Sequence, residues 1–163
     1  MTVELPEKIF KVIAEEARRK KKTIEGVIVE RFIEGLDPRA RVEVYMELFD
    51  KYLREADENY QRGDLPQTGE KYWRAVTSLL NAIGELESLP HYTHRDYVEI
   101  VEHIAEKYSD PEISTLFRLV EGLHANFYHN FLRKMTFESH RSGVLTLIKK
   151  LGSVIENLMR KKL

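Results

Sequence analysis

The stretch Glu121-Gly-Leu-His-Ala-Asn-Phe-Tyr-His-Asn-Phe-Leu132 decides the fold that we expect for this chain. It follows Asp110-Pro111, which is typical of a helix start, because Asp caps free N–H groups and Pro is favoured at the first helical position. Its side chains form three helical faces, which predicts a central helix packed on more than one side. The bulky face holds Leu116, Val120, Leu123, Phe127 and Phe131, the small face Gly122, Ala125, His129 and Leu132, and the polar face Asn126 and Asn130.

The same stretch carries the candidate site residues His124, Asn126 and His129. No other part of the sequence brings His, Asn and Tyr together so densely. Gly122 and Ala125 lie one helical turn apart, and two small residues at this spacing allow another backbone to approach closely. We therefore expect a chemical site on this helix, if the protein has one, and a homodimer contact along its small face.

The composition of the chain restricts the class of protein. Its 163 residues, 42% of them hydrophobic and 33% charged, suffice for one domain, or for a small domain with an appendage. A net charge of -1 gives no general attraction to nucleic acid or anionic membrane, so such contacts would need a local patch. The lack of cysteine excludes disulfide and thiolate chemistry. No apolar run approaches the roughly 20 residues of a membrane span, and we expect a cytoplasmic protein without membrane contact.

Hydrophobic periodicity and capping signals predict an all-α fold. The only strand that we expect is the alternating segment at residues 2–6, which has no partner strand in the chain and so also favours a homodimer. We expect an up-down helical bundle over residues 37–163 and a strand–helix–helix appendage over residues 1–36. The predicted helices besides the central one cover residues 7–20, 24–35, 38–62, 65–87, 94–108 and 139–162.

The appendage resembles the ribbon-helix-helix fold, on the basis of the Val-x-Leu-Pro segment before two short helices. In that family two chains pair their strands, the ribbon reads the major groove, and the second helix begins on a phosphate. The resemblance implies that Lys20, Lys21, Lys22 and Thr23 contact nucleic acid. Glu4 would face DNA unfavourably, so a helical hairpin used for packing or dimerisation is the alternative.

Four phrases of the sequence carry a resemblance to a known family. The phrases are Leu36-Asp-Pro-Arg-Ala-Arg-Val-Glu-Val-Tyr45, Gly63-Asp-Leu-Pro-Gln67, Glu70-Lys-Tyr-Trp-Arg-Ala75 and Leu123-His-Ala-Asn-Phe-Tyr128. They resemble the PaREP family of archaeal proteins, whose function is largely undetermined. That family is similar to the HEPN superfamily, which implies a HEPN-like bundle that dimerises. Members of the superfamily include metal-independent ribonucleases and partners of nucleotidyltransferases in toxin–antitoxin pairs.

The HEPN resemblance implies roles for the three candidate site residues. His129 takes the position of the catalytic His, Asn126 is a nearby polar residue, and His124 stands where active members have Arg. A neutral imidazole does not clamp phosphate as a guanidinium does. Positions 124 and 129 also lie roughly 140° apart around a helix, so they would converge only across a dimer.

We therefore expect a non-catalytic or altered member of this group, more plausibly not an enzyme, that acts around nucleic acid or nucleotide. One alternative is a metal-independent ribonuclease. Another is a DNA-binding regulator, or an interaction module of a toxin–antitoxin-like system that uses the appendage. A nucleotidyltransferase-type protein is a possible partner under the HEPN resemblance.

The sequence does not favour a metal or a cofactor. His91 and His94 lie close together, but neither a Cys nor a clear carboxylate partner accompanies them. The chain has no Gly-rich phosphate loop and no Ser-centred nucleophile motif. Surface histidines are the simpler interpretation, and we expect no metal site and no cofactor.

Overall fold

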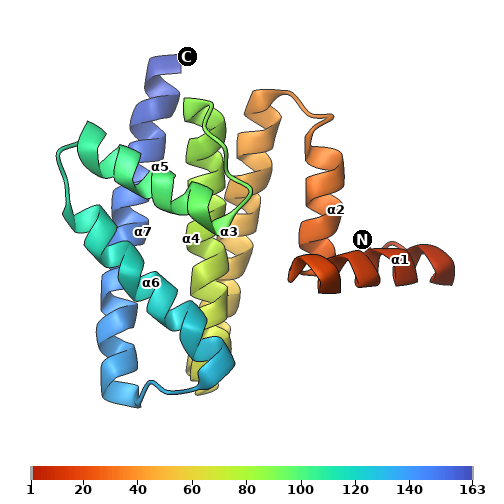
Figure 1. The fold of residues 1–163 in the computed structure, drawn as a ribbon, viewed down its shortest axis with the longest axis horizontal. Helices are drawn as coiled ribbons and strands as arrows, with labels where there is room; N and C mark the ends of the chain where they lie inside the picture. The colour runs from red at the N-terminus through yellow and green to blue at the C-terminus, as the bar shows by residue number, and fades with distance from the viewer. Residues whose placement is uncertain (1, 163) are drawn as a thin grey trace. The chain divides into compact units, whose positions relative to one another are not determined.

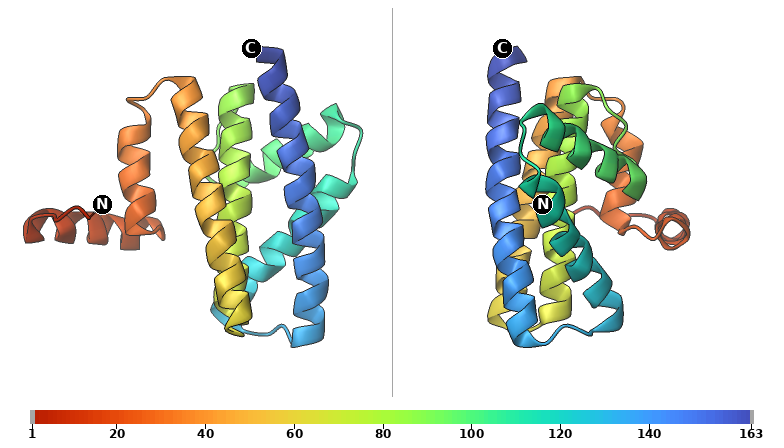
Figure 2. Two further views of the ribbon diagram at one scale, coloured as in Figure 1. Left: turned by 180° about the vertical axis from the view of Figure 1, so that it is seen from behind. Right: turned by 60° about the vertical axis from the view of Figure 1, so that its left-hand side comes forward.

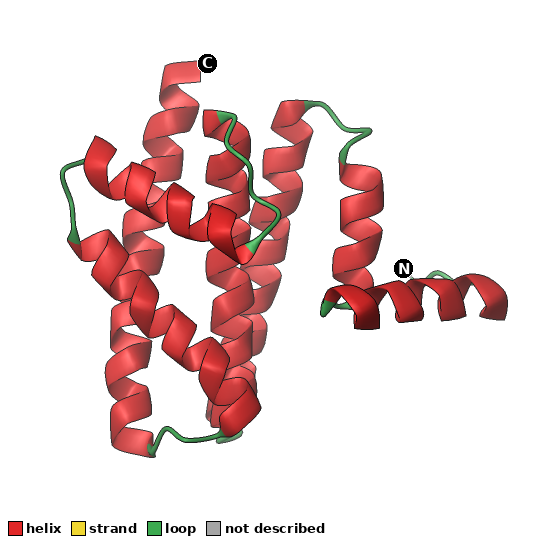
Figure 3. Cartoon of the chain, in the orientation of Figure 1, coloured by secondary structure: helices red, strands yellow, loops and turns green. Residues whose placement is uncertain are grey.

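The computed structural model describes residues 2–162, which form seven helices joined by loops (Figures 1 and 3). The chain divides into two compact units, Met1–Arg41 and Val42–Leu163. This all-α fold confirms the predicted fold class. The helices are α1 (Glu7–Lys20), α2 (Ile24–Ile33), α3 (Pro38–Gln61), α4 (Leu65–Glu87), α5 (His94–Lys107), α6 (Glu112–His129) and α7 (Lys134–Lys162).

The predicted N-terminal strand is absent. Residues 2–6 are exposed and adopt neither helix nor strand. A strand is maintained by hydrogen bonds to a neighbouring strand, and the described part of the chain contains no strand that could supply them. The prediction of a strand over residues 2–6 is therefore wrong for this chain, and the appendage consists of two helices after an extended segment.

The first unit is a helical hairpin with a small core. Thr23 caps α2, because its hydroxyl oxygen accepts a hydrogen bond from the Gly26 N–H at 3.0 Å. Lys21 ends α1 in the left-handed conformation, with a φ of 52°. Only Ala17, Val27 and Ile33 are buried among the described residues of this unit. Its exposed apolar side chains are Val3, Leu5, Ile9, Phe10, Val12, Phe32 and Leu36.

In the second unit α3, α4 and α7 run side by side, and α5 and α6 cross one face of this layer (Figures 1 and 2). Helix α4 packs against α5, α6 and α7, and it is the most buried helix of the unit. Its apolar side chains recur at helical spacing, so they form one face, and this face is enclosed by the rest of the unit. The buried apolar residues of α4 are Tyr72, Ala75, Val76, Leu79, Leu80, Ala82 and Ile83.

The small residues of α4 and α6 permit close contacts inside the unit. A Cβ built on Gly69 would lie 2.9 Å from the carbonyl oxygen of Leu123, so the backbones of α4 and α6 nearly touch there. A Cβ on Gly122 would lie 2.9 Å from Nε2 of His140 on α7. The small face of α6 is thus occupied at Gly122 by the same chain, and the homodimer stays a prediction.

Local capping determines where most helices begin. Asp37 and Asp64 accept hydrogen bonds from the Ala40 and Gln67 N–H groups at 3.0 and 3.1 Å. Thr93 and Asp96 form a capping box at the start of α5.

The predicted cap of α6 is wrong. Pro111 precedes the first residue of this helix, and no side chain caps it. The carboxylate of Asp110 instead binds the Lys150 ammonium on α7 at 2.5 Å. An ion pair between two helices has replaced the local cap. At its other end α6 stops at His129, so the predicted core residue Phe131 lies beyond the helix and is exposed.

Candidate functional site

His124 is held by a carboxylate on a neighbouring helix. Its Nδ1 lies 2.8 Å from Oε2 of Glu70 on α4, and Glu70 is only 5% exposed. Since an ionised carboxylate only accepts hydrogen bonds, Nδ1 of His124 carries the hydrogen of this bond. No described residue bonds Nε2, and the side chain is 30% exposed. His124 is therefore oriented from within the protein and has one ring nitrogen available for a ligand.

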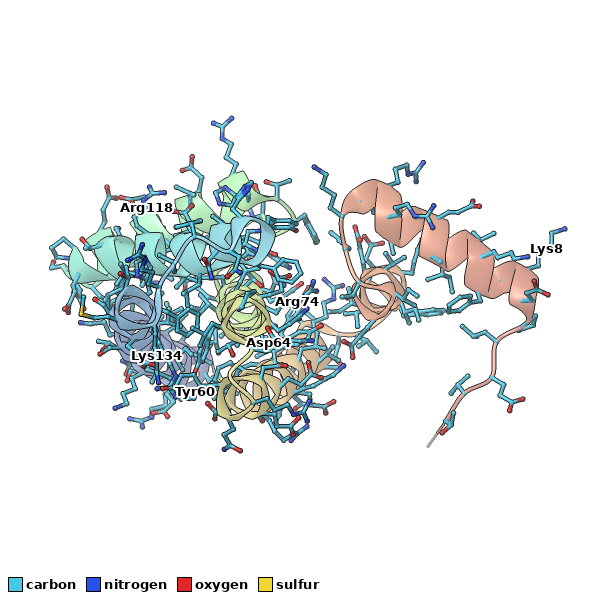
Figure 4. All side chains as sticks on the ribbon, turned by 90° about the horizontal axis from the view of Figure 1, so that it is seen from below. Lys8, Tyr60, Asp64, Arg74, Arg118 and Lys134 are labelled. Carbon is cyan, nitrogen blue, oxygen red and sulfur yellow. The ribbon has the colours of Figure 1, made fainter. Side chains whose placement is uncertain are left out.

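The same carboxylate also holds an arginine. Oε1 of Glu70 accepts a hydrogen bond from Arg74, one turn further along α4, at 2.8 Å. Arg74 extends from α4 (Figure 4), and its guanidinium carbon lies 5.9 Å from the centre of the Tyr52 ring. A buried carboxylate requires compensating donors, and here an imidazole and a guanidinium provide them. The two donors are consequently fixed next to each other at the surface.

The indole of Trp73 extends this arrangement. The His124 ring lies parallel to it with ring centres 4.5 Å apart, and the His94 ring is also parallel at 5.8 Å. His94 begins α5 and pairs with Glu121 on α6, with an Nε2–Oε1 distance of 2.9 Å. We call these six residues the Trp73 cluster, which is drawn from α4, α5 and α6. Its members are Glu70, Trp73, Arg74, His94, Glu121 and His124.

The structure separates the three residues that the HEPN resemblance grouped together. Asn126 is fully buried, and its Oδ1 accepts a hydrogen bond from the Leu132 N–H at 2.7 Å. The backbone carbonyl oxygen of Asn126 accepts a hydrogen bond from the N–H of Asn130. Asn130 ends α6 in the left-handed conformation. His129 is the exposed last residue of α6. Asn126 thus shapes the end of the helix, and only His124 belongs to the Trp73 cluster.

Asn126 and His129 are expected to differ sharply on substitution. Asn126→Ala leaves the partly buried Leu132 N–H without its partner, which should lower the free energy of unfolding by about 1–2 kcal/mol. His129→Ala removes an exposed side chain and should change it by less than about 0.5 kcal/mol. Urea unfolding followed by circular dichroism measures both values. Equal losses in the two variants would contradict this assignment.

The predicted nucleic-acid-binding lysines are engaged with carboxylates of the hairpin. Lys20 lies 2.9 Å from Glu16 and 3.4 Å from Glu30, and Lys22 lies 3.1 Å from Glu30. Thr23 is the cap of α2. Lys21 is exposed at the left-handed position between the helices. The basic turn is therefore largely neutralised, and its binding to nucleic acid stays a prediction.

These ion pairs should make the hairpin sensitive to acid. Hydrogen bonds from Lys20 and Arg31 hold the pKa of Glu16 below its ordinary value of 4.5. Burial raises the pKa of Glu30, but Lys22 and Lys20 outweigh this effect and leave it lowered. A lowered folded-state pKa stabilises the protein fully above the unfolded value, and this stabilisation is lost as the pH falls through the folded value. The protection factors of amides in α1 and α2, corrected for the intrinsic pH dependence of exchange, should fall below about pH 4.5, and less so in a Glu16→Gln/Glu30→Gln variant.

His91 is held inside the protein by contacts with its own chain. It is buried, its Nε2 lies 3.3 Å from Glu85 and 3.4 Å from the Tyr45 hydroxyl, and its Nδ1 lies 2.8 Å from the Leu89 carbonyl oxygen. A Cβ on Gly84 would come within 2.7 Å of its ring, so Gly84 makes room for it. No group of three or more His, Asp or Glu residues between positions 2 and 162 is arranged to hold a metal ion.

Sequence reasoning missed Glu70 and Arg74 as site residues. From the sequence alone, Glu70 is interpreted as a surface residue beside the packing face of Trp73, because a lone Glu on a helix is usually solvated. The available signal was the spacing: Glu70, Trp73 and Arg74 lie at i, i+3 and i+4, on one side of a helix. The partner of Glu70 lies 54 residues away, and no local pattern identifies it.

The comparisons with known proteins identify a family. None of the described helices is both long and apolar enough to cross a membrane. No curated protein and no solved structure matches the chain. One family model matches residues 44–148, which contain the whole Trp73 cluster and most of the second unit. The chain belongs to the archaeal PaREP1/PaREP8 family.

Proposed function

We propose that this protein binds the phosphate group of a nucleotide or nucleic acid at the Trp73 cluster, without cleaving it. One observation carries the proposal: the buried carboxylate of Glu70 holds His124 at 2.8 Å and Arg74 at 2.8 Å, and both donors remain partly exposed. The choice of ligand follows the expectation from the HEPN resemblance that the protein acts around nucleic acid or nucleotide.

Arg74 suits a phosphate ligand chemically. A guanidinium has five N–H donors, so the bond to Glu70 leaves others for phosphate oxygens. It also supplies, from α4, the permanent positive charge that α6 lacks at position 124. Its orientation by Glu70 is present before a ligand arrives, which reduces the entropy lost on binding.

His124 supplies the second group. When its imidazole is protonated, both ring nitrogens donate, one to Glu70 and one to the ligand.

Substitutions in the cluster test the proposal by fluorescence anisotropy of a labelled single-stranded RNA. Arg74→Gln and His124→Gln should each weaken binding about 10-fold or more, since hydrogen bonds to charged groups contribute about 1.5–3 kcal/mol. Arg95→Gln is the control, because Arg95 is an exposed arginine that pairs with Glu99 one turn along α5. Equal affinity in wild type and the Arg74 and His124 variants would refute the proposal.

Metal-independent RNA cleavage is the second candidate function. The Glu70–His124 pair favours it, because a carboxylate that orients an imidazole is a common form of general base. Cleavage of the RNA by wild type in the presence of a chelator, lost in His124→Gln and retained in His129→Ala, would support this function. Intact RNA under conditions where the protein binds it would leave the binding function.

A further inference from the structure

We infer that the indole of Trp73 is the stacking surface for a nucleobase, and that the base takes the place of the His94 ring. This inference rests on the proposed phosphate binding by Arg74 and His124 and names the rest of the ligand. Trp73 and Arg74 both lie within one turn of Glu70 on α4. A ligand that carries a phosphate and an aromatic ring close together, such as a nucleoside monophosphate, fits this pairing.

The geometry shows that Trp73 already accepts flat heteroaromatic rings. Both imidazoles lie within 19° of parallel to the indole. Phe117 and Tyr97 contact the same indole in tilted and edge-on orientations, and they help to fix its position. Bases stack on aromatic side chains in this parallel manner, and stacking tolerates different bases because each has a flat π-face.

His94 is the ring that a ligand can displace. Its ring centre lies 5.8 Å from that of Trp73, compared with 4.5 Å for His124. Its side chain is 59% exposed, and its one ion pair is with Glu121. Partly exposed pairs of this kind are weak.

Neither Glu121 nor His94 becomes a buried group without a partner when the His94 ring moves away from Trp73. Glu121 keeps its second partner, because its Oε2 accepts a hydrogen bond from Arg118 at 2.8 Å. The imidazole of His94 passes into water. His124, in contrast, is anchored on the buried Glu70 and stays in place. The Trp73 cluster therefore combines a fixed imidazole with an exchangeable one.

The single tryptophan of the chain makes this inference directly measurable. Adenosine monophosphate and ribose 5-phosphate share the phosphate and the sugar, and only the first has a base. Both are titrated by calorimetry, and the fluorescence of Trp73 is recorded with excitation where adenine does not absorb. The structure predicts that the nucleotide binds about 5–100-fold more tightly than the sugar phosphate, and that only the nucleotide quenches Trp73.

A His94→Ala variant provides the second test. It should bind adenosine monophosphate more tightly than wild type, since the base no longer competes with the imidazole, and bind ribose 5-phosphate equally well. Circular dichroism checks that the variant is folded.

The outcomes separate the two proposals. Equal affinity for the two ligands, or nucleotide binding without quenching, overturns the stacking inference and leaves phosphate binding intact. Binding of the RNA without binding of the nucleotide also overturns it. If neither the RNA nor the two small ligands bind, phosphate binding itself fails.

Discussion

Replacing Gly69 with valine is expected to lower the free energy of unfolding by about 3 kcal/mol and to abolish ligand binding at the Trp73 cluster. The added Cβ would lie 2.9 Å from the carbonyl oxygen of Leu123 and 3.2 Å from its Cβ. A backbone atom in a helix cannot yield as the end of a flexible side chain does, so α4 and α6 must separate. Glu70 follows Gly69 and His124 follows Leu123, and their 2.8 Å contact would be lost with the crossing.

Gly152 is the matched control for this prediction. It lies within α7, and a Cβ built on it meets no atom within 4 Å. Gly152→Ala should therefore stabilise the protein by about 0.5–1 kcal/mol, the usual gain when alanine replaces glycine inside a helix. Urea unfolding monitored by circular dichroism gives both values. A Gly69→Val protein as stable as wild type would show that α4 and α6 do not cross closely at this point.

The parts of the fold that were predictable depend on interactions between neighbouring residues. Thr23, Asp64 and Thr93 cap the helices that follow them, because a side-chain oxygen meets an N–H two or three residues further on. Such contacts depend only on residues a few positions apart, so the sequence alone indicates them. The strand over residues 2–6 failed for the opposite reason. A strand needs a partner, and the alternating pattern of residues 2–6 specifies only the apolar side of one strand, not its partner.

The candidate site was predictable only in part, because it depends on contacts between distant residues. His124 was named from its place on α6, and its hydrogen-bond partner in the structure is Glu70, which the sequence did not single out. Asn126 and His129 lie on the same helix as His124 and still face other surroundings. Arg74, the second side chain bonded to Glu70, lies on α4. Spacing along one helix therefore identified His124 as a candidate without identifying the residues that it contacts.

Substitution of Tyr72 is expected to cause the second large loss of stability. The residue is fully buried in α4, and its hydroxyl accepts a hydrogen bond from Nε of Arg141 on α7 at 2.9 Å and donates one to Asp57 on α3 at 3.4 Å. Arg141 also covers the ring of Tyr60 on α3, at 4.1 Å from its centre. Tyr72→Ala should lower the free energy of unfolding by about 3–5 kcal/mol through the cavity it leaves. Tyr72→Phe keeps the ring and should cost about 1–3 kcal/mol, because Arg141 loses an acceptor.

The hydroxyl of Tyr72 should also set the alkaline limit of the fold. Burial raises the pKa of Tyr72 from 10.0 to about 12, although the charge of Arg141 acts in the opposite direction. Since the folded-state pKa lies above the unfolded one, this contribution to stability is complete below pH 10 and disappears as the pH rises to about 12. The free energy of unfolding of wild type should fall across this interval more steeply than that of Tyr72→Phe, which has no proton to lose there. Parallel slopes for the two proteins would mean that the phenol of Tyr72 ionises as readily in the folded protein as in the unfolded chain.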